Sequence, residues 1–252
     1  MTQSDTLRTT EKSFDVLILL DELGGASLAE LTDRVELPKS TVHRHLTTLR
    51  RSGFVTEEDG EYYVGFRFLE LGYRARERRE VYSLAERPVR DLAEQTGERA
   101  QFVVEEQDEG VYLFIETGEH AVRAGLTVGH RIDLHSTAAG KVILSHLPEK
   151  RVDEILDTGG MSPSTDETIT DSGELRAQLS TVRDRGYAFN REENIDGLRA
   201  VAGPVTNADD ELIGVLSVAG PSNRMTGEWF EAEIPDLVLG SANELELRIA
   251  YA

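Results

Sequence analysis

Local signals in the first 64 residues, taken in order, predict three short helices followed by a tight hairpin. An apolar stripe over residues 14–23 marks the first helix, which two glycines close. Ser27 and Glu30 form a capping box that starts the second helix, because each side chain can bond the other residue's backbone amide. Pro38 suits the first turn of the third helix, where a missing amide removes no helical hydrogen bond.

The hairpin signal follows the third helix. Asp59-Gly60 separates two short β-type runs, residues 54–58 and 61–64, and is typical of a two-residue turn. Three helices with a hairpin as the wing predict a winged helix-turn-helix domain, which we place at residues 1–70.

The longest stretch without Asp or Glu lies at residues 37–56, 20 residues in a chain with 47 acids and a formal charge of −20. It spans the third helix, and clearing acids from one helix indicates that this helix meets an anion. Double-stranded DNA is therefore the expected partner. We assign these side chains to DNA binding: Ser27, Lys39, Ser40, Thr41, His43, Arg44, Thr48, Arg50 and Arg51.

The members of this set suit different contacts. Arg44 can address a guanine edge, because a guanidinium donates two parallel hydrogen bonds. Lys39, Ser40 and Thr41 suit phosphates near the helix N-terminus, and the two arginines at the helix end suit backbone phosphate. The plainer interpretation of such side chains is a solvated helix face.

Composition excludes several classes of function. A chain without cysteine has no disulfide, thiolate nucleophile or thiolate metal site. No run approaches the ~20 apolar residues of a membrane helix, and the N-terminus lacks the apolar core of a signal peptide, so we expect a cytoplasmic protein. The basic residues are 23 Arg and only 4 Lys, which with the many acids resembles proteins of salt-accumulating halophiles. The alternative is an ordinary acidic bacterial protein.

Charge and pattern divide the rest of the chain into a connector and a second domain. Residues 71–86 carry a net charge of +1 and belong to a helical pattern over 66–86, so we expect a linker helix. Residues 87–252 carry −16 and alternate strand and helix signals with antiparallel hairpins. They predict an α+β domain that does not meet DNA.

Segments spread over nearly the whole chain point to one family. SLAELTDRVELPKSTVHRHLTTLRRSGFV, GFRFLELG, LAEQTGE, VGHRIDLHSTAAGKVILSHLP, LRAQLSTVRDRGYAFNREENIDGLRAVAGPV and LSVAGP closely resemble, in order and spacing, the IclR family of transcriptional regulators. The resemblance implies a winged helix, a linker helix and a C-terminal GAF-like domain that binds a small metabolite. It also implies homodimers or tetramers on palindromic operators, no cofactor, and control of a carbon-catabolic operon.

The same resemblance implies an effector pocket. Backbone amides of Ala138 and Ala139, near a helix start, can hold a carboxylate, and Ser217 can donate a hydroxyl. The implied effector-binding residues are Ile132, Leu134, Ala138, Ala139, Asn190, Leu198, Ser217 and Ala219. The local alternative for these segments is a helix start, a turn and a buried strand.

Two residues depart from the family's usual pattern. Asn190 stands where the family often has Asp, and Ala219 where it often has Ser. An amide can donate where a carboxylate only accepts, and the second change removes a hydroxyl. We therefore expect an organic or sugar acid, but not the effector of the best-known relatives.

Other functions find weaker support. Residues 138–142 resemble a phosphate loop but lack its first Gly, and Val142 stands where Ser or Thr would bind magnesium. There is no GxSxG or HExxH pattern, so we expect no catalytic or metal-binding residues; the alternative enzyme would use Ser217 or His135. His120, His130 and His135 lack the spacing of a metal site. A further alternative is a metabolite-binding sensor that acts through protein partners rather than DNA.

Overall fold

The computed structural model describes residues 6–122 and 126–251, in two compact units, Met1–Arg78 and Arg79–Ala252. Each unit has its own hydrophobic core. Among the described residues, no helix is both long and apolar enough to cross a membrane. The functional boundaries expected at residues 70 and 86 remain predictions.

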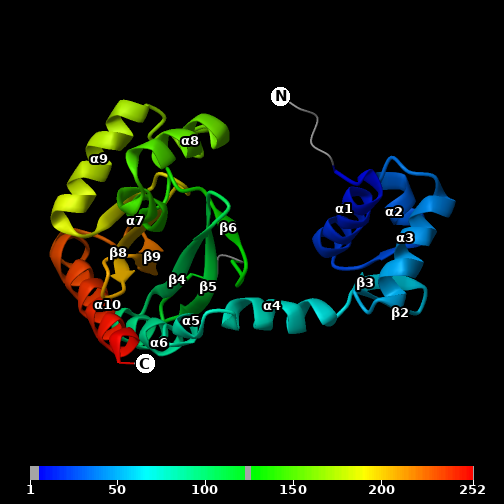
Figure 1. Ribbon diagram of the computed structural model, residues 1–252, viewed down its shortest axis with the longest axis horizontal. Helices are drawn as coiled ribbons and strands as arrows, with labels where there is room; N and C mark the ends of the chain where they lie inside the picture. Colours follow the sequence, from blue (N-terminus) through cyan, green and yellow to red (C-terminus); the bar gives the residue numbers. More distant parts are fainter. Residues whose placement is uncertain (1–5, 123–125, 252) are drawn as a thin grey trace. The chain divides into compact units, whose positions relative to one another are not determined.

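The N-terminal unit is a winged helix-turn-helix, as the order of local signals predicted (Figure 1). Its elements are α1 (Arg8–Leu23), β1 (Ala26–Ser27), α2 (Leu28–Arg34), α3 (Lys39–Arg51), β2 (Val55–Glu58) and β3 (Glu61–Val64). Val16, Leu31, Val42 and Leu46 come from all three helices and are fully buried. The helices therefore pack around one small core.

The turns of this unit use the predicted chemistry. The Ser27 side chain accepts the Glu30 amide while the Glu30 carboxylate accepts the Ser27 amide, which completes the capping box. Asp59 and Gly60 have φ of 54° and 88°, as a two-residue hairpin turn with both central residues at positive φ requires. The sequence did not predict β1, which pairs with β3 and gives the sheet order β1-β3-β2.

The helix predicted over residues 66–86 is wrong in its extent. The structure has α4 (Arg67–Glu77) and a separate short α5 (Glu80–Ser83), with Arg79 extended between them. No residue of α4 is buried, whereas Tyr82 and Ala85 belong to the core of the C-terminal unit. Phe68 of α4 is partly buried against the N-terminal core, so the two parts of the predicted helix contact different cores.

The C-terminal unit is built on a six-stranded antiparallel sheet of order β6-β5-β4-β9-β8-β7 (Figure 1). The strands are β4 (Arg99–Glu106), β5 (Glu109–Thr117), β6 (Arg131–Ile132), β7 (Ala188–Arg191), β8 (Leu198–Thr206) and β9 (Leu212–Pro221). The helices are α6 (Glu86–Thr96), α7 (Ala138–His146), α8 (Glu149–Gly159), α9 (Ser172–Arg185), the π-helical turn η1 (Trp229–Glu233) and α10 (Ile234–Ala250). This is the α+β, GAF-like architecture that the sequence predicted.

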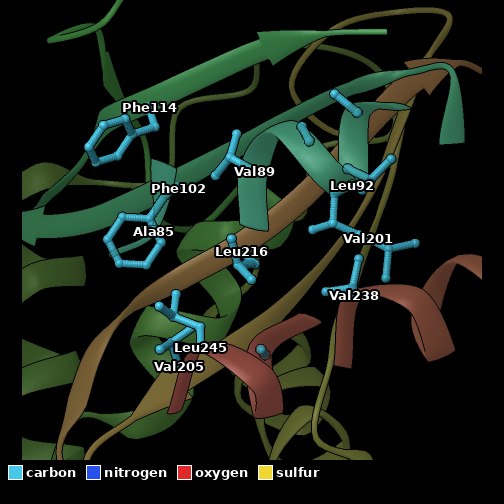
Figure 2. Packing of buried hydrophobic residues seen from close by; sticks show 14 of the residues in the cluster. Ala85, Val89, Leu92, Phe102, Phe114, Val201, Val205, Leu216, Val238 and Leu245 are labelled. Atoms are coloured by element: carbon cyan, nitrogen blue, oxygen red, sulfur yellow. The ribbon is translucent and has the colours of Figure 1, made fainter. Parts of the chain in front are cut away.

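Each face of the sheet carries its own apolar cluster, because successive strand residues point to opposite faces. On one face, Val89 of α6 and Val238 of α10 pack with Phe102 and Leu216 of the central strands (Figure 2). On the other face, a second cluster joins Val103 of β4 to residues of α7, α8 and α9. The face toward α7 also holds the residues that form the cavity described next.

Candidate functional sites: a basic helix face and a buried cavity

Helix α3 divides cleanly into a buried and an exposed face. Val42, His45, Leu46 and Leu49 are buried. Lys39, Ser40, His43, Arg44 and Thr48 are exposed, and Thr41 is half-buried. Six of the nine residues assigned to DNA binding therefore lie together on the outer side of one helix.

The N-terminus of α3 is open to an anion. No side chain caps it, and its first turn contains no acid. The Thr41 and Val42 amides bond the Pro38 carbonyl, while the Lys39 and Ser40 amides have no helical carbonyl behind them. Exposed amides at the positive end of a helix dipole suit a phosphate oxygen.

The other three assigned residues lie in different surroundings. Arg50 is ion-paired with Glu57 of β2, so part of its charge is compensated within the unit. Arg51 is exposed at the end of α3. The Ser27 hydroxyl donates to the Glu30 carboxylate at 2.8 Å and is engaged in the capping box. Their DNA contacts remain predictions.

Helix α1 adds two cations that the sequence did not indicate. Arg8 and Lys12 line a groove of about 460 Å³ together with Thr41, Arg44 and Thr48 of α3. Ser13 and His45 also line this groove, and the Ser13 Oγ lies 2.8 Å from Nδ1 of the buried His45. The sequence showed only the apolar stripe of α1, and which polar residues flank α3 depends on how the two helices pack.

The C-terminal unit contains a cavity of about 70 Å³ beside the start of α7. Seven of the eight residues assigned to the effector pocket line it: Ile132, Ala138, Ala139, Asn190, Leu198, Ser217 and Ala219. Leu134 does not; it is buried beneath Gly140 and lines another hollow with Asp133 and His135. The assignment of ligand contacts itself remains a prediction.

The helix side of the cavity is formed by the start of α7. Thr137 caps α7, its Oγ accepting the Gly140 amide at 3.1 Å, and its carbonyl accepts the Lys141 amide. The amides of Ala138 and Ala139 in the first turn have no helical carbonyl behind them. Both residues line the cavity, and no acid lies in this turn.

The sheet side of the cavity is set by strand register. Arg99 of β4 pairs with Ala219 of β9, which pairs with Ala200 of β8, which pairs with Asn190 of β7. All four line the cavity. Two small alanines thus lie between a cation and an amide along one row of the sheet.

Polar side chains on this face form a short network. The Arg99 Nε donates to Gln101 Oε1 at 3.3 Å, and Gln101 Nε2 donates to Ser217 Oγ at 3.4 Å. Burial lowers the pKa of the Arg99 guanidinium, and burial raises the pKa of the neighbouring Tyr112; each residue partly offsets the shift of the other. The Ser217 O–H keeps its proton available for a further acceptor.

Asn190 is one of the two residues expected to depart from the family's usual pattern. Its Nδ2 donates to Asn194 Oδ1 at 2.6 Å, and its Oδ1 accepts the Glu193 amide at 2.9 Å. An Asp at this position could only accept hydrogen bonds, so Asn194 would have to turn its Nδ2 toward it to keep the contact. The two hydrogen bonds of Asn190 join β7 to the turn that follows it.

Nine of the cavity residues were not assigned to the effector pocket from the sequence. These are Arg99, Gln101, Tyr112, Leu126, His130, Thr137, Asn194, Ile195 and Ala200. A signal existed for two of them, because Arg99 and Gln101 alternate with the apolar Ala100 and Phe102 along a strand. Alternation identifies a polar face, and only the register shows that this face borders a cavity.

Comparison with known proteins gives a consistent result. The model of the IclR helix-turn-helix domain matches residues 9–59, and that of the bacterial transcriptional regulator IclR C-terminal domain matches residues 73–246. The probable HTH-type transcriptional regulator ArcR of Halobacterium salinarum is 34% identical, covering 94% of this chain and 92% of its own. The transcriptional repressor IclR of Escherichia coli is 30% identical over 89% and 83% of the two chains. The crystal structure of Thermotoga maritima IclR is similar with a TM-score of 0.82 and 29% identity, covering 98% of this chain and 100% of its own.

Proposed function

This chain belongs to the IclR family of DNA-binding transcriptional regulators, and we propose that a small organic acid in its C-terminal cavity controls operator binding. Its relatives are regulators, not enzymes. The structure adds that Ser217 bonds Gln101, whereas His135 Nε2 lies 3.2 Å from the Ser162 carbonyl. Ser217 and His135 are therefore not arranged as a nucleophile and its base.

We infer that α3 is the operator-reading helix. The Lys39, Ser40 and Thr41 group, with the open amides of the helix start, binds phosphate. His43, Arg44 and Thr48 face the base edges in the major groove. The flanking residues Ser27, Arg50 and Arg51 serve the backbone, joined by Arg8 and Lys12 of α1 beside the same groove.

One observation carries the effector proposal. Sixteen residues line the cavity and, within residues 6–122 and 126–251, none of them is Asp or Glu, although the chain has 47 acids. At the average frequency of acids in the chain, a set of this size would contain about three of them. A cavity lined by backbone amides of a helix start and by hydroxyl and amide side chains, without carboxylates, suits an anion.

The volume of the cavity limits the size of this acid. At about 70 Å³ the cavity has room for a small ligand, on the order of a few heavy atoms, without rearrangement. Pockets for drug-sized ligands are several times larger, about 300–1,000 Å³. A short-chain acid fits without rearrangement, and a six-carbon sugar acid requires the walls to move.

The assembly and setting of the regulator follow the family pattern. We propose a homodimer or tetramer in the cytoplasm that acts on a two-fold symmetric operator, within a carbon-catabolic operon. A dimer presents two copies of α3, and half-sites about one helical turn apart, ~34 Å, match such symmetry. A sensor that acts through protein partners remains the alternative.

Two measurements on the full chain test this function. DNase footprinting of DNA upstream of its own gene is expected to give a two-fold symmetric footprint. Thermal unfolding with a panel of two- to four-carbon acids is expected to give a rise in Tm that grows with acid concentration. Absence of a footprint on the upstream DNA, together with specific binding of one protein partner, would support the alternative sensor. If no acid raises Tm while a neutral compound does, the acid proposal is overturned.

A further inference from the structure

Within residues 6–122 and 126–251, Arg99 is a buried cation without a carboxylate partner. Only 6% of its surface is exposed, at the first residue of β4 on the cavity wall. Among the described residues, the only hydrogen bond of its side chain runs from Nε to Gln101, and no ion pair involves it. The adjacent Glu98 is already held by Arg224, at 2.6 and 2.8 Å.

The same unit shows how a buried cation is otherwise held. Lys141 is 1% exposed, and its Nζ lies 2.6 and 2.7 Å from the two oxygens of Glu193. Removing a charge from water is unfavourable unless an opposite charge or several hydrogen bonds replace the lost hydration. Lys141 has that compensation inside the protein, whereas the two terminal NH₂ groups of Arg99 have none in the described chain.

We propose that the effector is a short dicarboxylate, with one carboxylate at the α7 amides and the second paired to Arg99. This inference rests on the proposed function and names the ligand class of the same cavity. The helix start contributes roughly half a positive charge and Arg99 a full one, so two walls attract an anion. A monocarboxylate can pair with either the α7 amides or Arg99, and it leaves the other group without an anionic partner.

The geometry of Arg99 favours a planar, two-oxygen group. A guanidinium donates two parallel hydrogen bonds to a carboxylate, and such charge-assisted pairs are about twice as strong as neutral hydrogen bonds. Its Nε bond to Gln101, which in turn bonds Ser217, holds the side chain along the sheet. Ala219 and Ala200, next in the row, leave space above the strands for the ligand.

The cavity sets the spacing between the two carboxylates. The small volume of the cavity, about 70 Å³, favours two carboxylates joined directly or through one carbon. A two-carbon linker needs a small movement of the Arg99 side chain, which its four rotatable bonds allow. Malonate and succinate are therefore the first probes.

The test compares each diacid with its monoamide, malonamate or succinamate, which keeps the size and removes one charge. Calorimetric titration of the full chain is expected to show the diacid binding at least about 10-fold tighter than the monoamide. Arg99→Gln is expected to reduce this ratio to within about twofold, and Arg99→Lys to give an intermediate ratio, because Lys keeps the charge without the paired donors. Arg87→Gln is the matched control, since Arg87 is exposed on α6 and paired with Asp91.

The results separate the two proposals. A ratio near one in the wild-type chain, or a ratio that Arg99→Gln leaves unchanged, would overturn the dicarboxylate inference while acid binding stands. Binding of neither diacid nor monoamide would overturn the proposed function itself. Arg99→Gln removes a buried charge, so its unliganded Tm is expected to equal or exceed that of the wild type. A lower unliganded Tm would show instead that Arg99 supports the fold.

Discussion

Replacing Arg44 with Glu is expected to weaken operator binding by about 100-fold, which corresponds to about 2.7 kcal/mol. Arg44 is exposed near the middle of α3 and borders the groove that α1 and α3 share. A two-bond contact to a guanine contributes about 1–3 kcal/mol of discrimination, and the reversed charge adds repulsion from phosphate. Fluorescence anisotropy with the footprinted operator measures the change.

Measuring operator affinity at two salt concentrations distinguishes a direct contact of Arg44 from long-range electrostatic attraction. At about 1 M KCl the screening length is only ~3 Å, compared with ~8 Å at 0.15 M. A lost contact persists at both concentrations, whereas a purely long-range effect disappears in 1 M. Arg87→Glu on α6 is the control and is expected to leave operator affinity within about twofold. An Arg44→Glu loss that vanishes in 1 M KCl would show that Arg44 makes no direct contact.

Lys141→Met is expected to destabilise the C-terminal unit by about 3–5 kcal/mol, because it leaves the Glu193 carboxylate buried without its cation. Burial lowers the pKa of Lys141, and the adjacent Glu193 carboxylate opposes that shift. The Glu193 amide also bonds Asn190, so the ion pair supports a residue of the cavity wall. Urea unfolding followed by the fluorescence of Trp229, the chain's single Trp, reports on this unit.

Two further variants test whether the pair, rather than the lysine alone, carries the effect. Lys141→Met with Glu193→Met removes both charges and is expected to recover at least half of the lost stability. Lys150→Met changes an exposed lysine of α8 and is expected to shift stability by no more than about 0.5 kcal/mol. Equal losses in the single and double variants would mean that packing around the Lys141 stem, and not charge, stabilises this site.

The N-terminal fold could be predicted because its signals are local. The capping box of Ser27 and Glu30 and the turn at Asp59-Gly60 each depend on residues within four positions of one another. β1 escaped prediction because two residues carry no periodicity, and their pairing with Tyr62 and Glu61 is a tertiary contact. The long helix over 66–86 was wrong for the same kind of reason, since its break reflects burial of Tyr82 in a second core.

The cavity was harder to predict than the fold. Seven of the eight residues expected from the family resemblance line the cavity. Leu134 lines a different hollow, and no local sequence pattern distinguishes it from the other seven. Arg99 lies 39 positions from Ala138 and 118 from Ser217 in the chain. Strand register brings Arg99 near Ser217, and the packing of α7 on the sheet brings Ala138 to the same cavity. The residue that most restricts the ligand is therefore one that required the structure.

The central claim is that acid binding and operator binding are coupled, and the most direct measurement is calorimetric titration of one acid with and without operator. The panel acid with the largest thermal shift is titrated into the full chain alone and into the chain saturated with operator DNA. Because coupling is reciprocal, operator must change the acid's affinity by the same factor by which the acid changes operator affinity, about 5- to 150-fold for typical couplings. Equal acid affinities in the two titrations would contradict the account.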